Sequence, residues 1–230
     1  MKKSFFLFIF FLFIPFLIFP EYYSGNTEDE ARIIRMPIWV FLEGQPGTMK
    51  EDEGSPFLPP KDALEKTSSF LLLGMAYGWK FSYTPSDKGR DVKEVFQIIP
   101  IENSKIRKEL ITIKEVKIKY PYVYSWAEYP LSIYEVERHS SWLSLKYKTI
   151  KGVGEGKRKE ETKGVKEAYT NAIKNAIMKY AKKQIKNKPK EIVGEVLIKS
   201  SPRLFCTSGL FKAEVELYIN IKEIIPYTVF

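Results

Sequence analysis

Cysteine and histidine are almost absent from this chain of 230 residues, which contains one of each, Cys206 and His139. A single cysteine cannot form an internal disulfide, so the stability of the fold must come from its apolar core. A structural zinc ion needs about four cysteine or histidine ligands, which this pair does not supply. We therefore expect no bound metal ion.

The residue patterns of common hydrolases are also missing. His139 is followed by Ser140 and Ser141, but no Gly-x-Ser-x-Gly motif is present to expose a nucleophile. Acidic side chains cluster at residues 28–30 and 51–53, in polar, turn-rich stretches that are typical of solvated loops. We expect no enzymatic activity. A hydrolase that uses His139 or the loop acids is the alternative.

A long apolar run occurs at the start of the chain, where residues 5–19 carry no polar side chain. Lys2 and Lys3 precede the run, and Pro15 interrupts it. A basic start and a short apolar core are typical of a secretory signal. The run is shorter than the roughly 20 residues of a membrane-spanning helix. We expect an exported protein of the periplasm or cell envelope.

The end of this segment leaves two alternatives open. Residues 1–25 are either a signal peptide that is cut between Pro20 and Asn26, or an anchor in which residues 5–19 stay in the membrane. Bulky Tyr22 and Tyr23 stand where small residues normally precede the cut. No cysteine lies just after the apolar run, so lipid attachment there is excluded.

Positive charge is concentrated toward the C-terminus of the chain. The formal net charge is +9, yet residues 21–70 hold ten acidic and five basic side chains. Residues 151–199 hold fourteen basic and six acidic ones. We interpret this asymmetry as a solvated, lysine-rich surface, and its alternative is an anionic partner, namely an anionic lipid or a cell-wall polymer. Nucleic acid is not expected as a partner of an exported protein.

Residues 143–230 predict a C-terminal module with the order strand, helix, strand, strand. Apolar residues alternate from residue 143 to 147 and again from 211 to 221, as in half-buried strands. Residues 165–180 repeat apolar side chains at spacings of three and four, which is typical of an amphipathic helix. Residues 192–198 are apolar at both odd and even positions, as in a central strand that is buried on both faces. A turn-rich loop is expected over residues 200–209.

Residues 26–104 predict a weaker version of the same order. We expect strands at 38–42, 79–83 and 92–98, with a helix over 61–76. Residues 105–142 read as a strand-rich connection. The fold class we predict is therefore α+β, with two packed β-α-β-β-like modules behind the N-terminal apolar segment.

A glycine-rich stretch, Gly152, Gly154 and Gly156, follows the first C-terminal strand segment. It does not fit a phosphate-binding loop, because Arg158 stands where that motif needs serine or threonine. It does not fit a dinucleotide fingerprint either, because position 157 is lysine. We expect no cofactor, and a strand that bends, bulges or passes close to another backbone.

Two groups of side chains are candidates for binding. The first is an aromatic row of one parity, Tyr120, Tyr122, Tyr124 and Trp126. We interpret this row as core or inter-module packing, and its alternative is a surface that stacks on sugars or lipid headgroups. The second group is a set of lysines near the end of the C-terminal helix, Lys179, Lys182, Lys183 and Lys186.

Residues from about 143 to 225 resemble the small exported β-α-β-β domain of the LPP-type lipoproteins and of the N-terminal region of the flagellar protein FlgT. The resemblance rests on Gly152-Val-Gly154, on two closing strands, and on a helix with periodic alanines at 168, 172, 176 and 181. The missing lipid-bearing cysteine departs from the lipoprotein pattern. The resemblance implies an envelope protein that binds other proteins and catalyses nothing.

The function expected from the sequence is a structural or protein-interaction role in the cell envelope, with envelope proteins as partners in a homo- or hetero-assembly. A flagellar assembly is one branch of this expectation. The alternative is a binding module for cell-wall sugar or anionic lipid.

Overall fold

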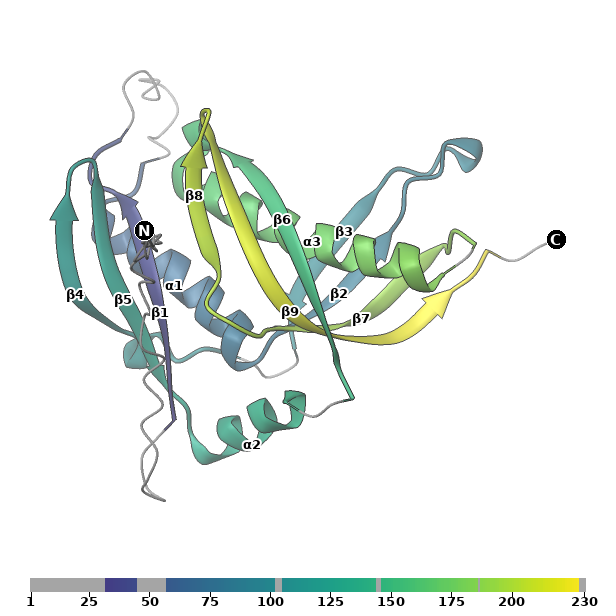
Figure 1. The fold of residues 1–230 in the computed structure, drawn as a ribbon, viewed down its shortest axis with the longest axis horizontal. Helices are drawn as coiled ribbons and strands as arrows, with labels where there is room; N and C mark the ends of the chain where they lie inside the picture. The colour runs from purple at the N-terminus through teal and green to yellow at the C-terminus, as the bar shows by residue number, and fades with distance from the viewer. Residues whose placement is uncertain (1–31, 45–56, 102–104, 144–145, 186, 228–230) are drawn as a thin grey trace, which may run out of the picture. The chain divides into compact units, whose positions relative to one another are not determined.

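Two antiparallel sheets carry the fold in the computed structural model (Figure 1), which describes residues 32–44, 57–101, 105–143, 146–185 and 187–227. The predicted signal, residues 1–25, lies outside these ranges. The elements are β1 (Ile33–Phe41), α1 (Pro60–Ala76), β2 (Trp79–Thr84), η1 (Lys88–Arg90), β3 (Val95–Pro100), η2 (Lys108–Leu110), β4 (Thr112–Lys119), β5 (Tyr122–Pro130), α2 (Ile133–Trp142), β6 (Lys148–Lys157), η3 (Arg158–Glu160), α3 (Glu161–Gln184), β7 (Glu191–Ile198), β8 (Arg203–Thr207) and β9 (Leu210–Ile225).

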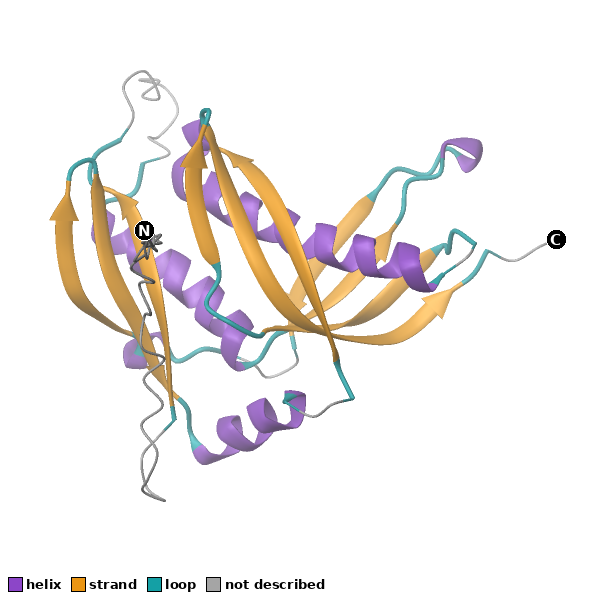
Figure 2. Cartoon of the chain, viewed as in Figure 1, coloured by secondary structure: helices purple, strands orange, loops and turns teal. Residues whose placement is uncertain are grey.

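The larger sheet has the strand order β3-β2-β7-β9-β6, with β8 paired to β9, and the smaller sheet has the order β1-β5-β4. Helix α3 packs on β6 and β9 of the larger sheet, whereas α1 contacts β1 and β5 of the smaller sheet and β7 of the larger one (Figure 2). One continuous apolar core therefore runs through both sheets and both helices. The mixed α+β class predicted from the sequence is confirmed.

The strands do not pair within the two packed β-α-β-β-like modules that the sequence predicted. β1 pairs with β5, from the segment that we predicted to connect the modules, while β2 pairs with β7 and so joins the C-terminal strands. The physical reason lies in β7, whose neighbouring residues Val196 and Leu197 point to opposite faces and are both fully buried. A strand that is apolar on both faces needs a neighbour at each edge, and β2 supplies the second one beside β9.

Two local predictions also need correction. The strand expected from residue 143 begins later: Leu143 is the C-cap of α2, and β6 begins at Lys148. Residues 144–145 lie outside the described residues. Helix α2 itself was missed, although Ser132 and Glu135 form a capping box at its start, a motif visible in the sequence. The loop expected over 200–209 contains the short strand β8, which pairs with β9.

The three glycines of β6 lie directly under α3. A Cβ atom added to Gly154 would lie 2.1 Å from the backbone nitrogen of Ala172, and one added to Gly156 would lie 2.0 Å from the carbonyl oxygen of Gly164. Four residues of helix rise about 6.0 Å and two residues of strand about 6.7 Å. Successive glycines of β6 therefore meet successive small residues of α3, and the two backbones touch.

Asparagines of α3 complete this contact at the sheet edge. β6 is an edge strand, so its outer carbonyl groups have no neighbouring strand to pair with. The side-chain amide of Asn171 donates to the carbonyl of Glu155 at 2.8 Å, and that of Asn175 donates to the carbonyl of Val153, also at 2.8 Å. The helix thus covers both the face and part of the free edge of β6.

We predict that Gly154→Ala lowers the free energy of unfolding by about 1–3 kcal/mol or more, because the new methyl group must push α3 away from β6. Urea denaturation monitored by circular dichroism measures the change. Gly89→Ala is the matched control, since the nearest atom to its added Cβ lies 3.5 Å away, and it should shift stability by less than about 0.5 kcal/mol. Equal stability of the two variants would contradict the tight contact.

Candidate functional site

A cavity of about 700 Å³ lies between α1 and the β4–β5 hairpin, and we call it the α1–β4 groove. Its volume falls within the range of about 300–1,000 Å³ that is usual for binding pockets. Most of its wall is aliphatic, and the side chains that form this wall are Leu42, Leu64, Ile111, Ile113, Val116, Ile118 and Val123. Two of them are open to solvent, Val116 at 56% exposure and Ile118 at 68%.

Charges of both signs stand around the groove. Lys61 and Glu65 lie one helical turn apart on α1, and Lys108 and Glu109 lie in η2. The groove is thus an apolar channel with a mixed rim. Exposed aliphatic side chains in one contiguous patch are uncommon on a solvated surface and are typical of a contact site.

A β-bulge in β4 sets the apolar face of the groove. Lys114 pairs with Trp126 and Lys117 with Tyr124, so two residues of β4, Glu115 and Val116, oppose one residue of β5. Glu115 has a positive φ of 53°. The extra residue shifts the alternation by one position, which puts Ile113 and Val116 on the same face, where both line the groove.

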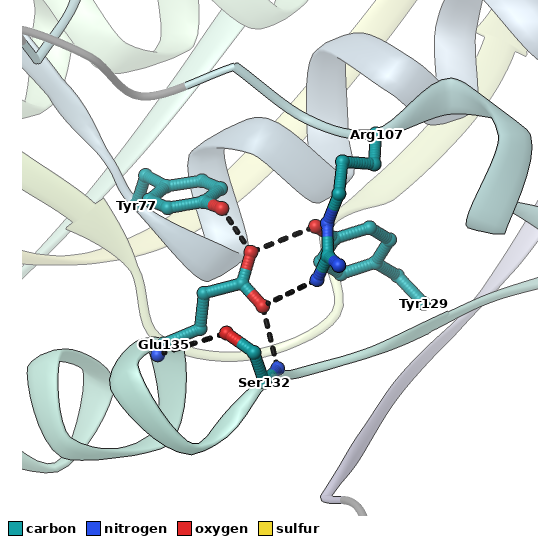
Figure 3. Close-up of polar contacts among 5 residues, drawn as sticks. All are labelled: Tyr77, Arg107, Tyr129, Ser132 and Glu135. Atoms are coloured by element: carbon teal, nitrogen blue, oxygen red, sulfur yellow. Dashed lines mark hydrogen bonds and ion pairs between the residues drawn. The ribbon is translucent and has the colours of Figure 1, made fainter.

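A buried carboxylate, Glu135, holds the neighbourhood of the groove together (Figure 3). It is 3% exposed and lies in the first turn of α2. Its Oε1 accepts hydrogen bonds from the hydroxyls of Tyr77 and, at 2.8 Å, of Tyr129. Its Oε2 accepts from the guanidinium of Arg107 at 3.0 Å and from the backbone N–H of Ser132 at 2.5 Å.

Glu135 therefore joins four segments of the chain. Tyr77 follows the end of α1, Tyr129 lies on β5, and Arg107 immediately precedes η2, whose Lys108 and Glu109 line the groove. The ion pair with Arg107 holds the start of η2 in place, and η2 forms part of the groove wall. Glu135 is a positioning residue for the groove and does not line it.

The charge of Glu135 is stabilised by these donors. Burial alone would raise its pKa, but the hydrogen bonds from Tyr77, Ser132 and Tyr129 outweigh burial and lower the pKa to about 2. Burial and the hydrogen bond to Glu135 raise the pKa of Tyr77 well above its ordinary value. A carboxylate with this pKa and these four donors is a poor proton acceptor, so a structural role fits the site better than general-base catalysis.

The predicted aromatic row is divided between packing and solvent. Tyr122 is partly buried against the core and packs on Trp39 of the neighbouring strand β1. Trp126 is half-buried under the guanidinium of Arg35, 4.3 Å from its ring centroid. Tyr120 and Tyr124 are exposed, at 74% and 39%.

Lysines that the sequence reasoning missed lie next to this row. The register of the hairpin places Lys117 of β4 opposite Tyr124 and Lys119 opposite Tyr122. Counting outward from the turn at Tyr120 and Pro121 would have predicted both pairs.

The predicted lysines of α3 do not form one site. Lys179 and Lys183 line a separate cavity of about 220 Å³ against the start of β6. The charge of Lys182 acts instead on Glu94 and helps to lower the pKa of that carboxyl, to which the hydrogen bond from Lys174 contributes most. Lys186 lies outside the described residues. No contact in the described ranges joins these lysines to the aromatic row.

Of the residues named for the hydrolase alternative, the loop acids at 28–30 and 51–53 lie outside the described residues. The Nδ1 atom of His139 makes no hydrogen bond within the described part of the chain, and the hydroxyl of Ser141 donates to the carbonyl of Arg138. Burial and the nearby charge of Arg32 lower the pKa of His139. The described residues contain no cluster of histidine, cysteine and acidic side chains that could hold a metal ion. None of the helices in the described ranges is long and apolar enough to cross a membrane.

By its fold the chain is a mixed α+β protein with an aliphatic groove beside an edge hairpin. It belongs to the family of an uncharacterized protein of Treponema pallidum (strain Nichols), to which it is 40% identical over 210 residues; the alignment covers 91% of this chain and 88% of that protein. A model of an uncharacterised family matches residues 22–227. No solved structure matches the chain.

These matches correct the resemblance to the LPP-type lipoproteins and to FlgT, which is wrong. The features behind it were a glycine-rich strand, an alanine-rich helix and two further strands. They arise wherever a helix packs at backbone contact on a sheet, and so they do not identify a family.

We predict that Glu135→Gln removes a specific part of the pH dependence of stability. The folded pKa of about 2 lies below the ordinary value of 4.5, so the unfolded chain binds a proton first as the pH falls. The stabilisation is complete above about pH 5 and is lost toward about pH 2. The variant should be less stable by about 1.5–3 kcal/mol at pH 7 and show a shallower loss between pH 5 and 2.

Glu137→Gln, at an exposed position of the same helix, is the control and should keep the wild-type pH profile. Urea unfolding of the three proteins between pH 7 and pH 2.5 measures the effect. A wild-type profile for Glu135→Gln would contradict the role of this carboxylate.

Proposed function

We propose that the chain is an exported, non-catalytic envelope protein that binds an apolar segment of a partner protein in the α1–β4 groove. The observation that carries the proposal is the aliphatic cavity of about 700 Å³ with Val116 and Ile118 open to solvent. An amphipathic helix or an extended segment with aliphatic anchors suits such a groove.

The rim supports a protein partner over a lipid or a sugar. Lys61 and Lys108 would attract an anionic headgroup, but Glu65 and Glu109 would repel it. A peptide segment can carry side chains of both signs and match this rim. No aromatic side chain is among the described residues that line the groove, so a sugar ring has nothing to stack on there.

Export is supported by the layout of the N-terminus. The apolar residues 5–19 follow two lysines, and the family match begins at residue 22, just after this run. A removable signal joined to a shared fold would give this pattern. The periplasm or cell envelope is therefore the proposed location, with residues 5–19 as an anchor if they are retained.

A second candidate function is binding of a cell-wall sugar or an anionic lipid on the outer side of the hairpin. The observation that favours it is the hairpin register, which places Lys117 beside the exposed Tyr124 and Lys119 beside Tyr122. Rings that alternate with ammonium groups suit an anionic polymer.

We predict that Ile118→Lys weakens partner binding at least tenfold, because it puts a charge among the aliphatic side chains of the groove; tenfold corresponds to about 1.4 kcal/mol. A photo-crosslinking residue at position 118 in intact cells identifies the partner. Titration of the purified partner then gives the affinity of each variant.

Ile99→Lys is the matched control, since Ile99 is an isoleucine of similar exposure, 57%, on the edge strand β3. It should bind like the wild type. Equal affinities of the two variants, or a crosslink from position 118 to lipid alone, would contradict the proposal.

We predict that the protein purified from its native cells lacks its first residues and begins between residues 21 and 26. Mass spectrometry of the intact protein from the soluble periplasmic and membrane fractions measures this. An intact N-terminus in the membrane fraction would support the anchor instead, and an intact N-terminus in the cytoplasmic fraction would contradict export.

A further inference from the structure

A second cavity, of about 210 Å³, lies between α1 and α3, and we call it the α1–α3 cleft. Lys66, Thr67 and Phe70 of α1 form one wall, and Thr162, Lys163 and Lys166 are among the residues of the other. The cleft uses positions of α1 that the α1–β4 groove does not use, because the groove is lined by Lys61, Leu64, Glu65 and Ser69.

Three lysines and no carboxylate are among the residues that line the cleft. Lys163 lies 4.0 Å from Glu160, which is at the limit of an ion pair. Lys66 and Lys166 form no ion pair with any described residue, and the ammonium group of Lys166 lies 5.6 Å from the ring centroid of Phe70. The net charge of the cleft is therefore positive.

A largely buried side chain with an unpaired hydroxyl adds an independent sign of a ligand. Tyr169 lines the cleft, is 3% exposed, and has no hydrogen bond to any residue in the described ranges. Its oxygen is not among the enclosed unpaired atoms of the described residues, so it is accessible and free to bond a ligand in the cleft. Burial raises the pKa of Tyr169 above its ordinary value, so the hydroxyl stays protonated and can donate. Thr67 and Thr162 bring two further hydroxyls to the same cavity.

The position on α3 distinguishes this cleft from the cavity at Lys179 and Lys183. Thr162 and Lys163 lie in the first turn of α3, where the helix dipole favours an anion. Lys179 and Lys183 lie in the last turns of the same helix, where the dipole opposes one. Both cavities carry lysines and have similar volumes, so they form a natural comparison.

We propose that the α1–α3 cleft binds a phosphate group carried on a small molecule or a lipid headgroup. Lysine ammonium groups supply the charge, and the hydroxyls of Tyr169, Thr67 and Thr162 supply neutral donors. The ring of Phe70 and the side chain of Val165 offer an apolar surface to the carrier of the phosphate. This inference does not depend on the α1–β4 groove.

The test is an NMR titration of the ¹⁵N-labelled protein with glycerol phosphate, and a second arm with vesicles of phosphatidylglycerol. The paired variant Lys66→Ala/Lys166→Ala should weaken binding at least tenfold. Tyr169→Phe, which keeps the ring, should weaken it about fivefold. The control pair Lys179→Ala/Lys183→Ala should stay within twofold of the wild type.

Amide shifts centred on Thr67 and Thr162 in the first arm would identify a soluble phosphate compound. Binding of vesicles alone, with the same dependence on Lys66 and Lys166, would identify a lipid headgroup. If both paired lysine variants lost the same amount of affinity, the binding would be due to non-specific charge and the proposal would be overturned. The absence of binding in both arms would also overturn it. Ile118→Lys should not change these titrations, so failure here is separable from failure at the groove.

Discussion

The contact between the backbones of β6 and α3 is the constraint on which the rest of the structure depends. Glycine on the strand and glycine or alanine on the helix allow an approach that no larger side chain permits. This approach holds α3 over the larger sheet and lets Asn171 and Asn175 reach the carbonyl groups of its edge. It also places the first turn of α3 opposite α1, which creates the α1–α3 cleft.

Helix α1 is the second organising element, because it contacts both sheets and lines a cavity on each of two sides. One side, at Leu64, is aliphatic, and the other, at Lys66, is basic. Glu135 joins the end of this helix to α2, to β5 and to the segment before η2. Burying a carboxylate costs free energy unless hydrogen-bond donors satisfy its oxygens, and here four donors do so. The two cavities thus both lie against α1 but are lined by different residues.

Periodicity predicted the elements better than their partners. The alternation over 211–221 became β9 and the apolar face over 165–180 became α3, because each pattern is local. The pairing of β2 with β7 was not predictable in this way, since it joins segments more than a hundred residues apart. The groove was missed for a related reason: Ile113 and Val116 differ in parity, and only the bulge at Glu115 brings them to one face. Helix α2 was missed although the spacing of Ser132 and Glu135 indicates its start.

The bulge in β4 gives the hairpin two surfaces of opposite character. Aliphatic side chains point into the groove, and lysines stand beside tyrosines on the other side. The turn at Tyr120 and Pro121 fixes the register of the residues that follow the bulge. A chain without Glu115 would restore regular pairing, with Val116 opposite Ser125 and Lys114 still opposite Trp126. Ile113 and Val116 would then share the groove face by simple alternation. The bulge therefore absorbs one surplus residue locally, so the hairpin can lose that residue without exchanging its two surfaces.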